Sequence, residues 1–266
     1  MGYSIAVAGK GGTGKTSLCG LTIRYLTEKK SGPILAIDAD ANTNLNEVLG
    51  LHVHASVGAL REESLNTIRS NTERPGGMSM EQLFDYQIQQ SLIEAKGFDL
   101  LVMGRPEGPG CYCAANNIIR KYMEKLADTY PFMVVDNEAG LEHLSRRTTQ
   151  DMDLLLIISD PTVRGVMTAG RIAALVDELK LNVKRSVLIV NRAGEGLCNP
   201  AQGGSGNGQD GKLQETIGAQ GVEFAGFVPA DQLIFEYDLN GKPLVELPAD
   251  SRALTGYYAI LDKLLA

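Results

Sequence analysis

The sequence has no tryptophan, and aromatic residues make up only 6% of its 266 residues. With 30 glycines, it favours tight turns and close backbone contacts over aromatic stacking platforms. The four cysteines are unevenly spaced, which excludes a disulfide scaffold. No apolar run approaches the roughly 20 residues that cross a bilayer, and the N-terminus does not resemble a signal peptide. We therefore expect a cytoplasmic protein with reduced thiols.

The chain also lacks an excess of positive charge. Its formal net charge is -7 and its pI is about 5.1. Broad binding to a nucleic-acid backbone requires cations that replace the released counterions, so no nucleic-acid partner is expected. The C-terminal segment has a single lysine after Arg252, too few basic residues for an amphipathic membrane anchor. No membrane partner is expected either.

The composition, 44% hydrophobic and 21% charged, is that of a globular protein, and the length favours one domain over residues 1–266. Short apolar runs predict buried strands at 4–8, 34–37, 99–103, 132–135, 154–158, 187–190 and 222–228. Apolar residues at helical spacing predict helices at 15–30, 114–129, 166–179 and 251–265. The alternation predicts an α/β fold with a mostly parallel sheet covered by helices on both faces. The Gly-rich stretch 196–211 is expected to be a flexible surface loop, either an inert insertion or a flap near a ligand.

The strongest motif is GKGGTGKT at residues 9–16, which fits G-x-x-x-x-G-K-[ST] between a predicted strand and a predicted helix. Its glycines let backbone N–H groups turn inward and form an anion cradle at a helix N-terminus. We expect Lys15 to reach the β- and γ-phosphates and the Thr16 hydroxyl to bind Mg²⁺. The loop residues predicted to bind ATP or ADP are Gly11, Gly12, Thr13, Gly14, Lys15, Thr16 and Ser17.

Carboxylates follow two of the predicted strands. Asp38 and Asp40 come after the run 34–37, and Asp136 follows the run 132–135. Ligands bind beyond the carboxyl ends of parallel strands, so both clusters are expected beside the phosphate loop. Asp136 suits the second shell of Mg²⁺, and Asp38 a hydrogen bond linked to that ion. Asp40 is the candidate for orienting the attacking water.

A Cys-x-Cys pair, Cys111 and Cys113, lies in a Gly/Pro-rich segment after the third predicted strand. Two thiolates suit a soft metal ion but underfill a four-coordinate site. A symmetric homodimer would supply four sulfurs on its two-fold axis. The alternative is a pair of incidental cysteines near a helix start. Thiolates alone do not separate Ni²⁺ from Zn²⁺.

Lys10 is a second lysine in the phosphate loop, either solvated or supplied as a cation to a facing subunit. With residues 10–16, KGGTGKT, it resembles the deviant phosphate loop of the MinD/nitrogenase-iron-protein/ArsA class of ATPases. In that class the first lysine is the signature residue, and two subunits sandwich nucleotide between them. The resemblance therefore implies a homodimer in which Lys10 and Lys15 both act on nucleotide.

Three further segments make nearly the whole chain similar to the CooC-type ATPases, which help to load nickel into carbon monoxide dehydrogenase or acetyl-CoA synthase. They are DADAN at 38–42, CYC at 111–113 and DNEAGLEHLSRR at 136–147. The resemblance implies that 38–42 and 136–147 are nucleotide-sensing switch segments. It also implies that Asn191 bonds the adenine edge beside Arg192, and that the segment after Val228, with Pro229 and Asp231, closes over the base. From the residues alone, an Asn at a strand end is most often a turn residue.

Three functions follow from these patterns. The first is an ATP-hydrolysing metallochaperone that binds nickel, or zinc, through the cysteine pair and delivers it to a client enzyme. The second is a nucleotide-dependent redox protein with a dimer-bridging Fe–S cluster. No cysteine accompanies Asp136, as one does in the nitrogenase iron protein, which counts against this role. The third is a metal-free positioning switch, against which the charge balance and the C-terminus both speak.

Overall fold

The computed structural model describes residues 2–40, 42, 44–60, 77, 79–104, 125–126, 128–137, 151–198 and 208–266. These residues form one sheet in the order β3-β4-β2-β5-β1-β6-β7-β8. Its strands are β1 (Tyr3–Gly9), β2 (Ile34–Asp38), β3 (Ile93–Ala95), β4 (Phe98–Val102), β5 (Phe132–Asp136), β6 (Asp151–Ser159), β7 (Asn182–Ala193) and β8 (Glu223–Pro229). Strand β3 runs antiparallel to β4, and the other neighbouring pairs are parallel. The predicted α/β fold is confirmed.

The central strands are apolar on both faces because helices cover both. In β1, Ile5 and Val7 pack into one core cluster, and Ala6 and Ala8 pack into the other. All four side chains are fully buried. This double burial is why the strand reads as a continuous apolar run and not as an alternation of apolar and polar residues.

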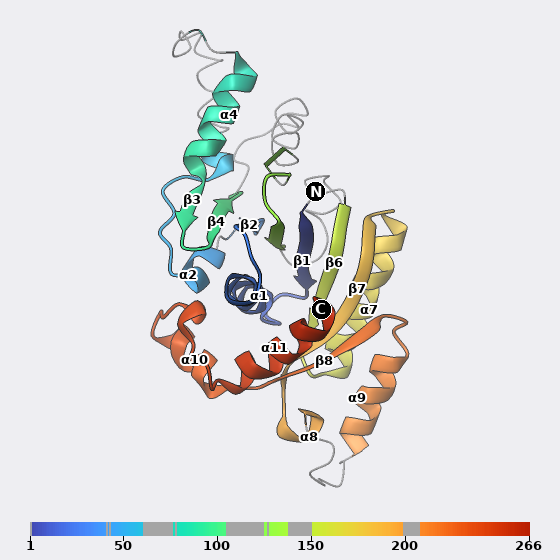
Figure 1. The fold of residues 1–266 in the computed structure, drawn as a ribbon. Helices are drawn as coiled ribbons and strands as arrows, with labels where there is room; N and C mark the ends of the chain where they lie inside the picture. Colours follow the sequence, from blue (N-terminus) through green and yellow to red (C-terminus); the bar gives the residue numbers. More distant parts are fainter. Residues whose placement is uncertain are drawn as a thin grey trace.

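Two sets of helices form these layers (Figure 1). One face is covered by α1 (Lys15–Lys29), α2 (Leu45–Leu49), the 3₁₀ helix η3 (Leu244–Glu246) and α11 (Arg252–Leu264). The other is covered mainly by α7 (Val163–Glu178) and α9 (Gly208–Gly218), with residues of α4 (Met80–Ser91). Two shorter helices are α8 (Glu195–Cys198) and α10 (Gln232–Leu239). Within the described part of the chain, no helix has the length and apolar composition needed to cross a bilayer.

The structure differs from the sequence expectation at several elements. Both ends of the segment predicted as a loop, 196–211, are helical, because α8 ends at Cys198 and α9 begins at Gly208. Residues 199–207 lie outside the described residues. Helix α4 was not predicted, although its capping box, Ser79 with Gln82, is a readable signal. Of the predicted helix 114–129, only 125–126 and 128–129 fall within the described residues.

Candidate nucleotide site

The phosphate loop connects β1 to α1, and two of its glycines are required by their surroundings. Gly14 is the N-cap of α1 at φ 88°, and a Cβ there would lie 2.4 Å from the Asn191 amide nitrogen. Gly9 has φ 155°, and its Cβ would lie 2.3 Å from the Ile158 carbonyl oxygen. A side chain at either position would collide with its neighbour. The glycines therefore let the loop pass against β6 and β7.

Several donors in the loop converge on one acceptor, the carbonyl oxygen of Lys10. The Thr13 hydroxyl donates to it at 2.9 Å, the Thr13 N–H at 3.4 Å and the Lys15 ammonium at 3.4 Å. Lys15 is 7% exposed, whereas Lys10 is exposed. A contact of 3.4 Å is long for an ammonium donor, so phosphate oxygens can compete for Lys15. In this structure the donors of the predicted anion cradle that can be placed, those of Thr13 and Lys15, are therefore directed at the Lys10 carbonyl.

The two predicted carboxylate clusters lie side by side, next to this loop. Asp38, at the end of β2, is the register partner of Asp136, at the end of β5, and Asp136 also pairs with Val7 of β1. Both carboxyl-bearing residues are buried, Asp38 at 0% and Asp136 at 1% exposure. The Ala39 N–H donates to the Asp136 carbonyl at 2.9 Å and joins the two strand ends.

Asp136 has a buried carboxylate without a hydrogen-bond donor among the described residues. Its pKa is raised to about 7, chiefly by burial; the charges of Asp38 and Asp40 contribute to this rise, and Thr16 and Lys15 oppose it. Within the described residues, neither Asp136 carboxylate oxygen meets the geometry of a hydrogen bond, Thr16 included. A buried carboxylate without donors is costly unless a cation compensates it. With the Thr16 hydroxyl beside it, this oxygen donor set fits Mg²⁺.

Asp38 is held differently, because backbone groups engage it. Its carboxylate accepts hydrogen bonds from the N–H groups of Asp40 and Leu45, both at 3.1 Å. Burial nevertheless raises its pKa to about 6. Asp40 is half-buried, and one of its oxygens accepts the Asn42 N–H at 2.8 Å. The role predicted for Asp40, orienting the attacking water, stays a prediction.

Asn191 and Arg192, at the end of β7, contact the phosphate loop itself. The Asn191 amide donates to the Thr13 carbonyl at 2.9 Å, and the Arg192 guanidinium donates to the Gly12 carbonyl at 3.0 Å. The sequence predicted an adenine contact here and not these bonds, which join residues about 180 positions apart in the chain. The adenine contact stays a prediction.

Pro229 ends β8, and Asp231 follows as a helix cap. One Asp231 oxygen accepts the Leu233 N–H at 2.9 Å at the start of α10. The other accepts the Ser251 hydroxyl at 2.7 Å and the Ala253 N–H at 3.1 Å at the start of α11. These donors lower the pKa of Asp231 despite partial burial. Its carboxylate thus joins the starts of two helices, and the closure of this segment over the base, which the resemblance implies, stays a prediction.

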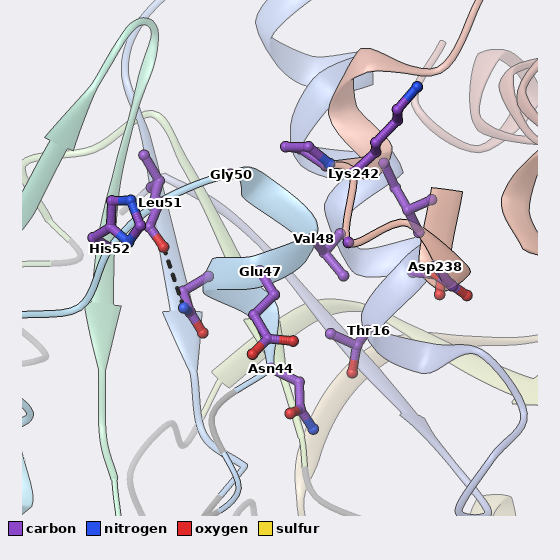
Figure 2. A pocket seen from close by; sticks show the side chains of 14 residues that line it. Thr16, Asn44, Glu47, Val48, Gly50, Leu51, His52, Asp238 and Lys242 are labelled. Carbon is purple, nitrogen blue, oxygen red and sulfur yellow. Dashed lines mark hydrogen bonds between the residues drawn. The ribbon is translucent and has the colours of Figure 1, made fainter. Parts of the chain in front are cut away.

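A pocket of about 870 Å³ opens beside Thr16 and Ser17. In Figure 2, Asn44 and Glu47 come from the α2 wall, and Asp238 and Lys242 come from the opposite wall, formed by α10 and the segment before η3. Burial raises the pKa of Asp238, while Arg192 lowers it. These wall residues carry no signal in the local sequence, because no local pattern shows that residues about 190 positions apart face each other.

The cysteine pair falls outside the described residues, so the structure does not place Cys111 or Cys113. Cys19 is fully buried in the core beneath the site, and burial raises the pKa of its thiol. Cys198 is half-buried in α8. Among the side chains that the structure describes, no group of three or more His, Cys, Asp or Glu residues could hold a metal ion.

Known proteins are similar to this chain in sequence and in fold. It is 41% identical over 261 residues to an uncharacterized ATP-binding protein of Methanocaldococcus jannaschii, with 98% of each chain covered. It is 30% identical over 187 residues to the carbon monoxide dehydrogenase accessory protein CooC of Rhodospirillum rubrum, covering 66% of this chain and 69% of that protein. The MinD cell division protein of Aquifex aeolicus shares the fold with a TM-score of 0.67 and 20% identity, over 99% of this chain and 96% of that one.

The septum site-determining protein MinD of Pyrococcus horikoshii, solved with Mg-ADP, has a TM-score of 0.65 at 17% identity, over 99% of this chain and 96% of that one. The phosphate loop, the buried carboxylates at the strand ends and this fold agree with the family model that matches residues 4–244. The chain belongs to the family of the CobQ/CobB/MinD/ParA nucleotide binding domain.

Proposed function

We propose that the protein hydrolyses ATP to ADP and phosphate with Mg²⁺, and uses the cycle to control a dimer. The observation that carries this proposal is the buried Asp136 carboxylate, which lies beside Thr16 at the start of α1 and has no hydrogen-bond partner among the described residues. Thr16 and Asp136 would hold the ion, and Asp38 would hydrogen-bond to its water shell. When bound, the ion neutralises charge that develops on the phosphates.

The remaining steps belong to the side chains of this chain. Lys15 moves from the Lys10 carbonyl to the β- and γ-phosphates, and Asp40 orients the attacking water. The exposed side chain of Lys10 extends to the nucleotide of a facing subunit in a homodimer. Its backbone carbonyl, in contrast, accepts hydrogen bonds from Thr13 and Lys15 in its own loop.

The pocket beside Thr16 and Ser17 would take the nucleoside. It is contiguous with the loop, and it offers the carboxylates of Glu47 and Asp238 as acceptors for ribose hydroxyls. Nothing in this assignment requires the Asn191 amide to leave the Thr13 carbonyl. An adenine that bonds Asn191 would have to use the hydrogen-bonding capacity of the Asn191 amide that the Thr13 carbonyl and the Arg192 N–H leave over.

The cargo of the cycle is proposed to be a soft metal ion, Ni²⁺ or Zn²⁺, held by Cys111 and Cys113 of two subunits. Delivery would go to carbon monoxide dehydrogenase or acetyl-CoA synthase. Similarity to a carbon monoxide dehydrogenase accessory protein over two thirds of the chain supports this assignment. The stoichiometry of thiolates supports sharing across a two-fold axis.

An anaerobic Ni²⁺ titration of the reduced protein tests the cargo, read by sulfur-to-nickel charge transfer and by mass in solution. We expect one ion per two chains in the wild type and in Cys198→Ser, and none in Cys111→Ser/Cys113→Ser. Ni²⁺ binding that persists in the double variant would remove the metallochaperone from consideration. ATPase activity that is the same in the wild type and in the double cysteine variant would then favour a positioning switch, in keeping with the fold shared with MinD.

The same preparation tests the redox alternative. Anaerobic reconstitution with iron and sulfide would produce an absorption band at about 400 nm if a cluster assembled between subunits. We expect no such band in a protein whose cysteine pair binds nickel.

A further inference from the structure

The end of β7 holds the phosphate loop at two consecutive carbonyl groups. Asn191 donates to the Thr13 carbonyl at 2.9 Å, and Arg192 donates to the Gly12 carbonyl at 3.0 Å. Neighbouring residues on one strand thus fix neighbouring peptide groups in the loop. The two contacts differ in their surroundings, because Arg192 is exposed whereas Asn191 is 5% exposed.

Because a peptide group is planar, a bond that holds its carbonyl also fixes the direction of its N–H. In a trans peptide group, the carbonyl of one residue and the N–H of the next point in opposite directions. When Arg192 holds the Gly12 carbonyl, the Thr13 N–H points the other way, toward the Lys10 carbonyl on which the other loop donors converge. When Asn191 holds the Thr13 carbonyl, the Gly14 N–H of the same peptide group points away from the Asn191 amide.

The backbone at Arg192 is strained in a way that its burial does not explain. Its φ is 57°, in the left-handed region that favours glycine, and its own N–H donates to the Asn191 side-chain oxygen at 2.9 Å. Among the described residues other than glycine, Lys180 alone shares a positive φ, at 52°. Arg192 is exposed, so burial in the core does not account for this residue at a position with positive φ. Its bond to the loop supplies a reason for its presence.

We propose that Arg192 is a positioning residue of the phosphate loop, which fixes the orientation of the Gly12–Thr13 peptide group, and with it the shape of the cradle, before nucleotide arrives. It acts through the Gly12 carbonyl and does not need to touch the reacting atoms. The proposal rests on the proposed function in assuming that nucleotide phosphates enter this cradle. The effect of Arg192 on Asp238 shows that its charge also reaches the wall of the adjacent pocket.

Three substitutions at Arg192 and two at Lys180 test this role. Arg192→Ala and Arg192→Gly both remove the guanidinium, but glycine also relieves the backbone strain. Lys180→Ala and Lys180→Gly repeat the same backbone change at the C-terminal end of α7, where no contact with the loop exists among the described residues. Arg192→Lys retains the positive charge and an N–H donor group without the planar guanidinium, and should restore part of the effect.

Amide hydrogen exchange of the loop peptide, residues 11–16, is the primary measurement, made without nucleotide. We expect exchange about three- to tenfold faster in both the Ala and Gly variants of Arg192, the range for an exposed bond worth about 1 kcal/mol. Neither Lys180 variant should change it. Loop exchange that stays at the wild-type rate in Arg192→Ala and Arg192→Gly would overturn the proposal.

Mg-ADP affinity and steady-state kinetics separate this inference from the proposed function. A positioning residue should weaken ADP and raise KM more than it lowers kcat, because the catalytic groups Lys15 and Asp40 remain. Wild-type protein that binds ADP but hydrolyses no ATP would defeat the proposed hydrolysis and leave the exchange result intact. Equal losses of ADP affinity in the Arg192 and Lys180 variants would assign the effect to the backbone alone and overturn the positioning role.

Discussion

Asp38 and Asp136 occupy paired positions on the adjacent strands β2 and β5, and both are buried at the end of the sheet where the phosphate loop begins. Asp38 is held by two backbone N–H groups, whereas Asp136 has no hydrogen-bond partner among the described residues. The two carboxyls are neighbours and both are buried, so their pKa values are raised, to about 7 for Asp136 and about 6 for Asp38.

The stability of the protein should therefore fall as pH rises from about 4 to about 7. The Asp136 carboxyl has an ordinary pKa of 3.8, which is raised to about 7 in the folded protein. Between these values the folded state retains a proton that the unfolded chain has released, so raising the pH favours unfolding. Asp38, raised to about 6, acts in the same direction.

Chemical denaturation across this pH range without Mg²⁺ measures the slope. Asp136→Asn should flatten it and raise the free energy of unfolding at pH 8 by on the order of 2 kcal/mol, because a buried charge is removed. The control Asp177→Asn, on the exposed end of α7, should leave the slope unchanged. A steeper slope in Asp136→Asn would show that the carboxylate is compensated in the folded state.

Mg²⁺ should stabilise the ADP-bound protein more at pH 8 than at pH 6. At pH 6 protons compete with the cation for Asp136, whose pKa is about 7. Thermal unfolding with ADP, with and without Mg²⁺, gives the stabilisation at each pH. Asp136→Asn should retain a response to ADP but lose the Mg²⁺-dependent part at both pH values. A Mg²⁺ effect that survives this substitution would place the ion elsewhere.

Gly14→Ala should damage the loop more than Gly12→Ala, although both glycines have positive φ, 88° and 80°. A Cβ at Gly14 meets the Asn191 amide at 2.4 Å, whereas a Cβ at Gly12 meets nothing within 4 Å. Both variants carry backbone strain, but Gly14→Ala also displaces Asn191 from the Thr13 carbonyl. We expect Gly14→Ala to lower the free energy of unfolding by about 1–3 kcal/mol more. Equal losses in urea denaturation would contradict the steric argument.

Asp231→Ala should cost stability through two helices at once. It removes the N-cap of α10 and the acceptor for Ser251 and Ala253 at α11, a loss of about 1–2 kcal/mol in the free energy of unfolding. Asp231→Asn should lose less, because asparagine is an equally good N-cap. Isothermal titration with ADP decides whether Asp231 also contacts the base. If Asp231→Asn binds ADP as the wild type does, the base contact predicted from the sequence is wrong.

The sequence was sufficient for features whose signal is local or follows from strand order. Residues 9–16 carry the phosphate loop as one motif, and the rule that sites lie beyond the ends of parallel strands brings Asp38 and Asp136 to it. The pairing of these two residues was not predictable, because β2 and β5 are adjacent in the sheet but not consecutive in the chain, and the sequence does not reveal the order of the strands. The contact of Arg192 with Gly12 and the pocket wall at Asp238 depend on tertiary placement in the same way.

Lys10→Ala should separate turnover from binding. The Thr13 and Lys15 contacts in the loop use the Lys10 carbonyl, which alanine keeps, so the cradle should bind ADP within about twofold of the wild type. The exposed ammonium that would reach a facing subunit is lost, so ATP-dependent dimerisation and hydrolysis should fall by at least about tenfold. Lys15→Ala provides the contrast, because it removes the buried cation of the cradle and should weaken the binding of ADP itself.

Light scattering with a non-hydrolysable ATP analogue and a phosphate-release assay measure the two effects. If Lys10→Ala dimerises and turns over as the wild type does, the lysine does not act across a dimer, and the resemblance to the deviant phosphate loop is structural alone.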